Sequence, residues 1–179
     1  MEKRYYNIII DGYDKGGLMY APSDWPFHPV ILDGEDIMSS QQLVLELRDG
    51  PYRHFNSCVG GGNIVSKDFM DTILPFITPE TCLEFLPVKV VSQEYGDKEY
   101  YIMHFTKIHD VINKDATLYV PGTDSIVKLR LDNEKVKELD VFNSQPYVND
   151  VIVSKRVCNA IKKNHLDVGI EFVPVYCEK

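Results

Sequence analysis

An internal repeat constrains the fold of this chain more than any other feature of its sequence. The stretch Val151–Tyr176 (VIVSKRVCNAIKKNHLDVGIEFVPVY) echoes an earlier one, Asn63–Val91 (NIVSKDFMDTILPFITPETCLEFLPVKVV). Both contain I-V-S-K, an isoleucine six residues after the lysine, and a later E-F-x-P-V segment. Two copies of a supersecondary unit indicate two related halves, because a solenoid normally needs three or more units.

Each copy has the pattern of a strand, a short helix and a second strand. The residues before Ser66 and Ser154 are apolar or β-branched, which suits a buried strand. Each serine stands where a helix N-cap belongs, and its hydroxyl can accept a bond from a free backbone N–H. Both helices then carry an apolar stripe. In one it comprises Phe69, Met70, Ile73 and Leu74, and in the other Val157, Cys158, Ile161 and Leu166.

This paired pattern resembles a family of bacterial immunity proteins from polymorphic toxin systems, first catalogued as a domain of unknown function. Its members are similar in carrying a V-S-x6-I unit that runs into E-F-x-P-V, near the middle and again at the end. The resemblance extends to Tyr100–Met103 and Asp110–Asn113, and covers roughly residues 60 to 176. It implies a protein without enzymatic activity that neutralises a toxin, and it carries over no catalytic residue.

The remaining segments predict mainly strands, at Arg4–Ile10, Leu43–Leu47, Tyr100–Thr106, Thr117–Val120, Ile126–Leu131 and Val136–Phe142. A short helix over Gln41–Leu47 and a helical turn over Glu134–Leu139 are alternatives. The prolines in residues 11–36 exclude regular helix there. We therefore predict an α+β fold of mostly antiparallel strands with few short helices. Residues 1–179 suit a single domain, or two intimate lobes, 1–92 and 93–179, each ending in one repeat unit.

Net charge and cysteine content indicate which class of partner the chain binds and in which cellular compartment we expect it. The net charge of −8, from 27 acidic and 19 basic side chains, argues against binding to nucleic acid or to an anionic membrane. It favours a basic partner, although an acidic balance also keeps many proteins soluble. The only early apolar run, Ile8–Ile10, is too short for a signal peptide or a membrane span. Four cysteines without CxxC spacing are typical of a cytoplasmic protein with free thiols.

Few residues have the spacing that catalysis or metal binding needs. Cys58 follows His54 and precedes three glycines, which offers a thiol with a nearby base. No second histidine with a supporting amide or carboxylate is apparent, so a flexible turn is the simpler interpretation. His104 and His109, five residues apart, make no metal pair on a strand or a helix. We therefore predict no catalytic residue, no metal and no cofactor.

The leading hypothesis is a cytoplasmic immunity protein that neutralises a cognate toxin by stoichiometric binding. The alternatives are a small enzyme with a site near Cys58 and a homo-oligomeric interaction module. Loops on a rigid scaffold usually carry recognition, and aromatic groups beside carboxylates supply an anchor and steering toward a basic toxin. The predicted contact therefore lies in the loop-rich N-terminal third, with the 94–99 turn as a neighbour. Its candidate residues are Tyr20, Asp24, Trp25, Glu35 and Asp36. An equally simple alternative is that Trp25 fills the core beneath this loop.

Overall fold

The computed structural model describes residues 5–21, 43–59, 62–144 and 150–178, and over these residues the fold is α+β, as predicted. Mostly antiparallel strands dominate, and the three α-helices of the described residues are short. The helices are α1 (Lys67–Ile73), α2 (Asn133–Val136) and α3 (Lys155–Lys163). The strands are β1 (Tyr5–Ile10), β2 (Leu18–Tyr20), β3 (Leu43–Arg48), β4 (Phe55–Val59), β5 (Asn63–Val65), β6 (Leu83–Val91), β7 (Lys98–Phe105), β8 (Leu118–Tyr119), β9 (Ile126–Lys128), β10 (Arg130–Asp132), β11 (Val141–Phe142), β12 (Ile152–Ser154) and β13 (Ile170–Glu178).

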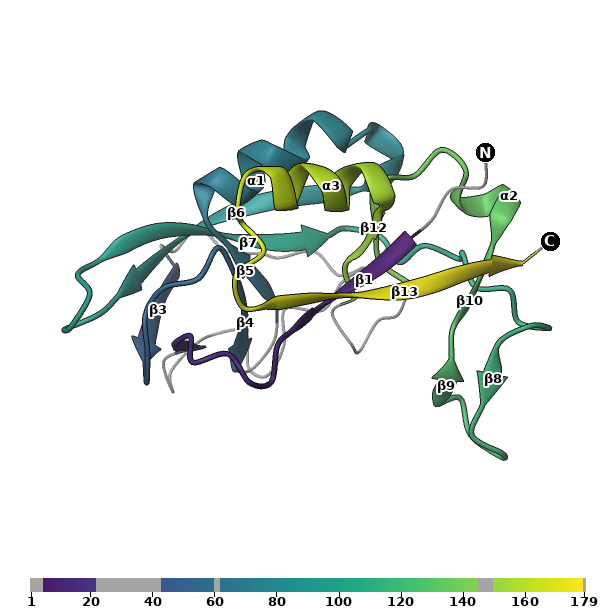
Figure 1. Cartoon of the computed structure of the whole chain (residues 1–179), viewed down its shortest axis with the longest axis horizontal. Helices are drawn as coiled ribbons and strands as arrows, with labels where there is room; N and C mark the ends of the chain where they lie inside the picture. Colours follow the sequence, from purple (N-terminus) through teal and green to yellow (C-terminus); the bar gives the residue numbers. More distant parts are fainter. Residues whose placement is uncertain (1–4, 22–42, 60–61, 145–149, 179) are drawn as a thin grey trace.

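The strands form two large sheets and a separate hairpin (Figure 1). One sheet has the order β10-β13-β1-β12-β11, and the other closes into a barrel in the order β2-β3-β6-β7-β5-β4. Helices α1 and α3 lie side by side on the same side of the sheets. The hairpin β8–β9 projects from the end of the molecule that carries α2 and β10.

The two repeat units have the predicted strand–helix–strand structure and the same strand register. In both, the two strands of the unit flank a third strand that runs antiparallel to them, β7 in one and β1 in the other. One row across the three strands shows the match, because it contains valine, tyrosine and proline in each unit. The rows are Val65–Tyr101–Pro87 and Val153–Tyr6–Pro174.

The repeat extends beyond the segments that sequence similarity reveals. Strand β4 pairs with β5 as β11 pairs with β12, so Phe55 and Val141 are equivalent. Strands β3 and β10 pair in parallel with the far side of β6 and β13, which makes Leu45 and Leu131 equivalent. Both leucines are completely buried. Each unit is therefore a five-stranded sheet with one helix, and only its middle retains a recognisable sequence.

The strand pairing divides the chain differently from the predicted lobes, 1–92 and 93–179. Strand β1 lies in the sheet of the C-terminal unit, between β12 and β13. Strand β7, which follows residue 92, lies in the sheet of the N-terminal unit. The second unit thus takes its central strand from the beginning of the chain, so its elements are in a circularly permuted order. Sequence distance could not show this, because β-pairing joins segments regardless of their separation.

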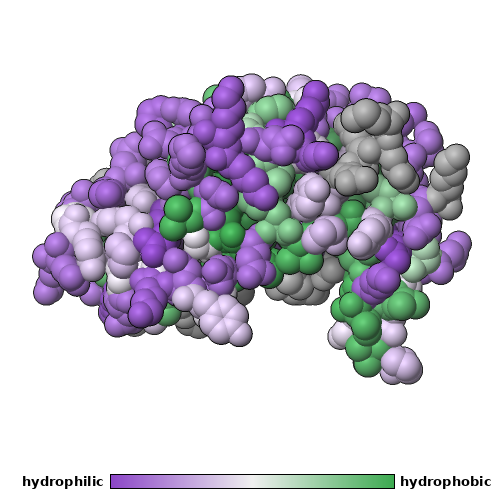
Figure 2. Space-filling model, viewed as in Figure 1, coloured by the Kyte–Doolittle hydropathy of each residue, from purple (hydrophilic) through white to green (hydrophobic). Residues whose placement is uncertain are grey.

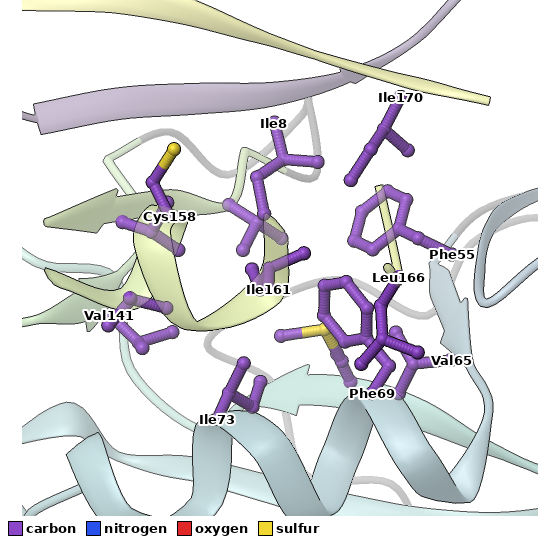
Figure 3. Packing of buried hydrophobic residues seen from close by; sticks show 14 of the residues in the cluster. Ile8, Phe55, Val65, Phe69, Ile73, Val141, Cys158, Ile161, Leu166 and Ile170 are labelled. Atoms are coloured by element: carbon purple, nitrogen blue, oxygen red, sulfur yellow. The ribbon is translucent and has the colours of Figure 1, made fainter. Parts of the chain in front are cut away.

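A shared hydrophobic core joins the two units into one body. Its centre is the contact between α1 and α3, where Phe69 and Ile73 point toward Ile161 (Figure 3). These three side chains are at most 1% exposed. The predicted stripe faces the core throughout α3, where Cys158 is a small buried residue as expected, but in the first unit it is wrong for Leu74, which follows α1 and is 51% exposed. Two further cores fill the barrel around Leu45 and the C-terminal sheet around Leu131.

The structure corrects three details of the sequence analysis. The predicted strand Val136–Phe142 is wrong over its first half, where α2 ends at Val136, and only Val141–Phe142 is strand. The predicted strand Ile126–Leu131 is two strands, β9 and β10, which belong to different sheets. Finally, Ser66 accepts a hydrogen bond from the backbone N–H of Phe69, whereas Ser154 occupies the N-cap position but makes no capping bond with its side chain.

Candidate functional site

A cleft among the described residues lies where the loop after β1 meets β4 and the start of β13. It has a volume of about 390 Å³. The loop provides one wall, and the other is provided by β4 and by Gly169, which precedes β13. The cleft therefore lies at the seam between the two units. Its lining includes Ile10, Asp11, Asp14, Leu18, Arg53, Phe55, Asn56, Ser57 and Cys58.

An ion pair fixes the loop against the barrel. The guanidinium of Arg53 donates two hydrogen bonds to Asp14, from Nε at 2.8 Å and from Nη2 at 3.0 Å. Both side chains are mostly buried. The hydrogen bond from Arg53 lowers the pKa of Asp14, and the backbone N–H of Gly16 adds to this effect. A bidentate pair in a half-buried setting holds its geometry well, so the wall of the cleft is preorganised.

Glycine backbone forms the surface against which this pair packs. A Cβ atom on Gly169 would lie 2.8 Å from Oδ2 of Asp14, and Gly169 has a φ of +81°. Few residues other than glycine adopt that backbone conformation without strain. Gly169 lies beyond the end of α3 and permits the approach of the β1 loop. Its carbonyl also accepts a hydrogen bond from the backbone N–H of Asp11.

Large apolar side chains are exposed among the residues that line the cleft and next to them in the chain. Tyr13, in the loop between the lining residues Gly12 and Asp14, is 95% exposed, and its backbone N–H donates to Oδ1 of Asp11. Ile10, Leu18 and Val168 are also large apolar residues with exposed side chains. Apolar groups around a concave, partly polar floor are typical of protein contact sites. The loop 11–18 belongs to the N-terminal third, where the sequence predicts the contact.

The predicted contact residues fall only partly within the described chain. Tyr20, on β2, is half-buried, and the guanidinium of Arg48 lies 4.9 Å from the centre of its ring. It pairs across the sheet with Glu46, which pairs in turn with Val91 at the start of the 94–99 turn. The barrel thus brings Tyr20 and this turn to the same end of the sheet. The other candidates, Asp24, Trp25, Glu35 and Asp36, lie outside the described residues.

Sequence reasoning missed both Tyr13 and the Asp14–Arg53 pair. The composition of residues 11–17, rich in aspartate and glycine, signalled a turn without indicating its partner. Arg53 is 39 residues from Asp14 along the chain. Only the closure of the barrel brings them together, because β2 pairs with both β3 and β4.

The geometry around Cys58 does not form a nucleophile and a base. Cys58 is buried, and burial raises the pKa of its thiol to about 11. The thiolate that would attack a substrate is therefore scarce near neutral pH. His54 lies four residues earlier, and consecutive strand residues are about 3.3 Å apart, so the two are about 13 Å apart along the chain. The Nδ1 atom of His54 instead lies 2.8 Å from the hydroxyl of Ser66.

Two further histidines, His104 and His109, have structural partners. Nδ1 of His104 lies 2.7 Å from a carboxylate oxygen of Glu84, across the β6–β7 pair. His109 is buried, with Nδ1 at 2.7 Å from Oδ1 of Asn143 and Nε2 at 2.9 Å from the carbonyl oxygen of Glu80. No group of three or more potential ligands suited to a metal ion occurs in the described ranges. The two histidines thus hold neighbouring elements together.

A second apolar surface lies on the projecting hairpin. Figure 2 shows that this hairpin is largely hydrophobic, in contrast to the polar surface above it. Leu118 is 57% exposed and Val127 65%, and Val120 is exposed as well. Isolated apolar residues are normal on protein surfaces, but a contiguous group on a projecting element indicates a contact site.

Comparison with known proteins adds no identity to these observations. No known family model matches the chain, and no curated protein is similar enough to count as a relative. In the parts of the chain that the structure describes, no helix is both long and apolar enough to cross a membrane.

Proposed function

We propose that this protein is an immunity protein that neutralises a cognate toxin domain by stoichiometric binding at the seam cleft. The observation that supports this proposal most is the group of exposed apolar side chains in and next to a preorganised, partly polar cleft. The resemblance of the repeat to immunity proteins supplies the biological context. Neutralisation by occupancy needs only a surface that excludes the toxin's substrate.

Tyr13 is the proposed anchor of the contact. A tyrosine offers a large contact area with only two side-chain torsions to order on binding, which is why tyrosines often dominate interfaces. The backbone around it is held by the Asp11 carboxylate, so the ring projects from a defined position. The exposed ring of Tyr13 would contribute to binding, because burying it against the toxin removes a large apolar area from water.

Charge favours a basic partner at the same place. The side chains that line the cleft and are charged near neutral pH are Asp11, Asp14 and Arg53. Because Asp14 and Arg53 neutralise each other, Asp11 leaves the cleft with an excess negative charge. The chain as a whole carries a net charge of −8. These charges would accelerate the approach of a basic toxin, and the acceleration would weaken with added salt.

The test first identifies the toxin domain, by searching the products of neighbouring genes for one that this protein binds, and then measures the affinity of the pair by calorimetry. We expect Tyr13→Ala to weaken binding by about 30-fold or more, which is the loss typical of a hot-spot residue. The melting temperature should not change, because the ring is exposed. Tyr176→Ala is the matched control, since Tyr176 is an exposed tyrosine near the end of β13 that lies away from Gly169 and the cleft.

Two outcomes would contradict the proposal. If one molecule of this protein inactivated many toxin molecules, neutralisation would be catalytic and not stoichiometric. If Tyr13→Ala left the affinity unchanged, or if Tyr176→Ala weakened it as much, the contact would lie elsewhere. An Asp11→Lys variant then separates steering from anchoring, because it should lower the association rate and its salt dependence more than it raises the dissociation rate.

A further inference from the structure

His109 has a hydrogen-bond partner at each ring nitrogen, and both partners are oxygens. Its Nδ1 lies 2.7 Å from Oδ1 of Asn143, and its Nε2 lies 2.9 Å from the backbone carbonyl oxygen of Glu80. A carbonyl oxygen only accepts hydrogen bonds, so Nε2 carries a proton in this arrangement. His104 differs, because its Nδ1 lies beside Glu84 whereas its buried Nε2 has no partner among the described residues.

The backbone of His109 fixes which way the Asn143 amide is turned. The N–H of His109 donates to Oδ1 of Asn143 at 3.2 Å, and this is the same atom that faces the ring. If the amide were rotated by half a turn, its NH2 group would meet this N–H, and two donors would face each other. Oδ1 therefore accepts both bonds, so Nδ1 of the ring must also carry a proton. A histidine that donates from both ring nitrogens is an imidazolium cation.

The ring is buried at a junction of the two units. Glu80 belongs to the short helical turn η2 (Pro79–Thr81), which precedes β6 of the first unit, and Asn143 follows β11 of the second. His109 is 7% exposed and Asn143 is completely buried. Water therefore cannot easily replace a bond that either side chain loses, and each loss has a structural consequence.

The imidazole packs against neutral groups. The rings of Phe105, on β7, and Phe142, on β11, contact it edge-on, with 6.3 and 6.2 Å between ring centres. The charged side chains on the elements around it are exposed or bind other partners: they are Glu80, Lys107, the pair Asp110–Lys135 and the pair Asp140–Arg156. Among the described residues, the second ring proton is thus bound by a neutral amide oxygen.

We propose that His109 and Asn143 form a proton-dependent switch between the two units. With two ring protons, Oδ1 of Asn143 accepts from both the ring and the backbone N–H, as in the structure. When Nδ1 gives its proton to water, this nitrogen becomes an acceptor, and the NH2 group of a rotated Asn143 amide donates to it. The rotation keeps a bond at each ring nitrogen, but the backbone N–H of His109 loses its partner. Loss of one proton therefore loosens the backbone at His109, next to η2.

Nuclear magnetic resonance of the whole protein tests the switch. A pH titration follows the ring nitrogens of His109, its backbone N–H and the side-chain amide of Asn143. We expect all three signals to change with one common midpoint. Above this midpoint, exchange of the His109 N–H with solvent, corrected for its intrinsic pH dependence, should accelerate about tenfold, because a buried N–H without an acceptor opens more readily.

Asn143→Asp gives an independent test. A carboxylate only accepts hydrogen bonds and favours a neighbouring cation, so this variant should move the midpoint of the His109 ring upward by about one pH unit or more. The faster exchange of the His109 N–H should move with it. His165→Gln is the matched control, since His165 is exposed beyond the end of α3 and should leave the three coupled signals unchanged. The wild-type titration decides the matter even if Asn143→Asp does not fold.

Two results would overturn the proposal. One is a His109 ring whose number of protons stays the same, whether one or two, throughout the pH range in which the protein is folded. The other is a ring titration without a change in the Asn143 amide and the His109 N–H at the same midpoint. Both measurements use this protein alone, so their outcome does not depend on the proposed binding of a toxin at the seam cleft.

Discussion

The two repeat units share strand order and register but differ in how the sheet face away from the helices is covered. In the N-terminal unit, β2 closes the sheet into a barrel, with Met19 and Leu45 completely buried inside. In the C-terminal unit the sheet stays open. There α2 and a single bridge from Ile112 to Leu131 cover the equivalent face. The sheet face that α1 and α3 cover therefore has the same structure in both units. The opposite face is covered by different elements in each unit.

The N-cap serines of α1 and α3 differ in their side-chain hydrogen bonds. The residues at the equivalent neighbouring positions explain this difference. In both units the serine N–H donates to a carbonyl of the preceding strand, that of His54 for Ser66 and that of Asp140 for Ser154. His54 and Asp140 are thus equivalent positions. The His54 ring reaches the Ser66 hydroxyl, but the Asp140 carboxylate is bound by the guanidinium of Arg156. The buried Ser154 hydroxyl is left without a hydrogen-bond partner among the described residues.

The largest expected effect on stability comes from a substitution in the contact between α1 and α3, which joins the two units. Phe69→Ala should lower the free energy of unfolding by about 3–5 kcal/mol, because it empties a completely buried site between α1 and α3. Urea denaturation should still show one transition for both units. Two separate transitions would show that the units fold independently. Ile73→Val and Ile161→Val, at equivalent positions, should each cost about 0.5–1.5 kcal/mol and serve as a matched pair.

The next effect concerns the ion pair at the seam. Asp14→Asn should cost about 1.5–3 kcal/mol near neutral pH, because Arg53 loses a charged hydrogen-bond partner. The lowered pKa of Asp14 means that this stabilisation is present above the ordinary carboxyl pKa of 3.8 and is lost as the pH falls toward the folded value. Denaturation between pH 7 and pH 3 measures it. A variant that declines with acid as steeply as the wild type would contradict this role.

A smaller effect sharpens the comparison of the caps. Ser66→Ala should destabilise the protein by about 1 kcal/mol, through loss of the bond from the Phe69 N–H and of the contact with His54. Ser154→Ala should be close to neutral or slightly stabilising, because it removes a buried hydroxyl without a partner. Chemical denaturation of the two variants side by side measures the difference. Equal losses would show that Ser154 caps its helix in solution.

The last prediction concerns the reactivity of the cysteine thiols and involves no change in the free energy of unfolding. Raising a thiol pKa from 9.0 to about 11 lowers the thiolate fraction at pH 8 about 100-fold. Cys58 should therefore react with iodoacetamide much more slowly than Cys82 and Cys177, which are partly exposed. Peptide mass spectrometry after timed alkylation gives the order. Rapid labelling of Cys58 in the folded protein would revive the alternative of an enzyme site.

The sequence alone determined the α+β class, the two strand–helix–strand units and most of the helix residues that enter the central core. The reason is local, since hydrophobic period, a serine before a helix and a β-branched run each act within a few residues. The apolar stripes that contain Phe69 and Ile161 could be recognised in the sequence, because any helix that buries one face needs apolar residues at helical spacing. The position of Tyr20 near the 94–99 turn was also anticipated, although the contact with a toxin stays a prediction.

Only the tertiary structure decided which strands pair and what those pairings bring together. Pro87 and Pro174 show this, since each lies within a strand just before the second neighbour begins to pair, at Val88 and Tyr176. A missing N–H is tolerated there because only one side of the strand is paired. Likewise β1 completes the distant unit, and Arg53 meets Asp14 across the barrel. Such contacts depend on chain closure and shared burial, which no short window of sequence contains.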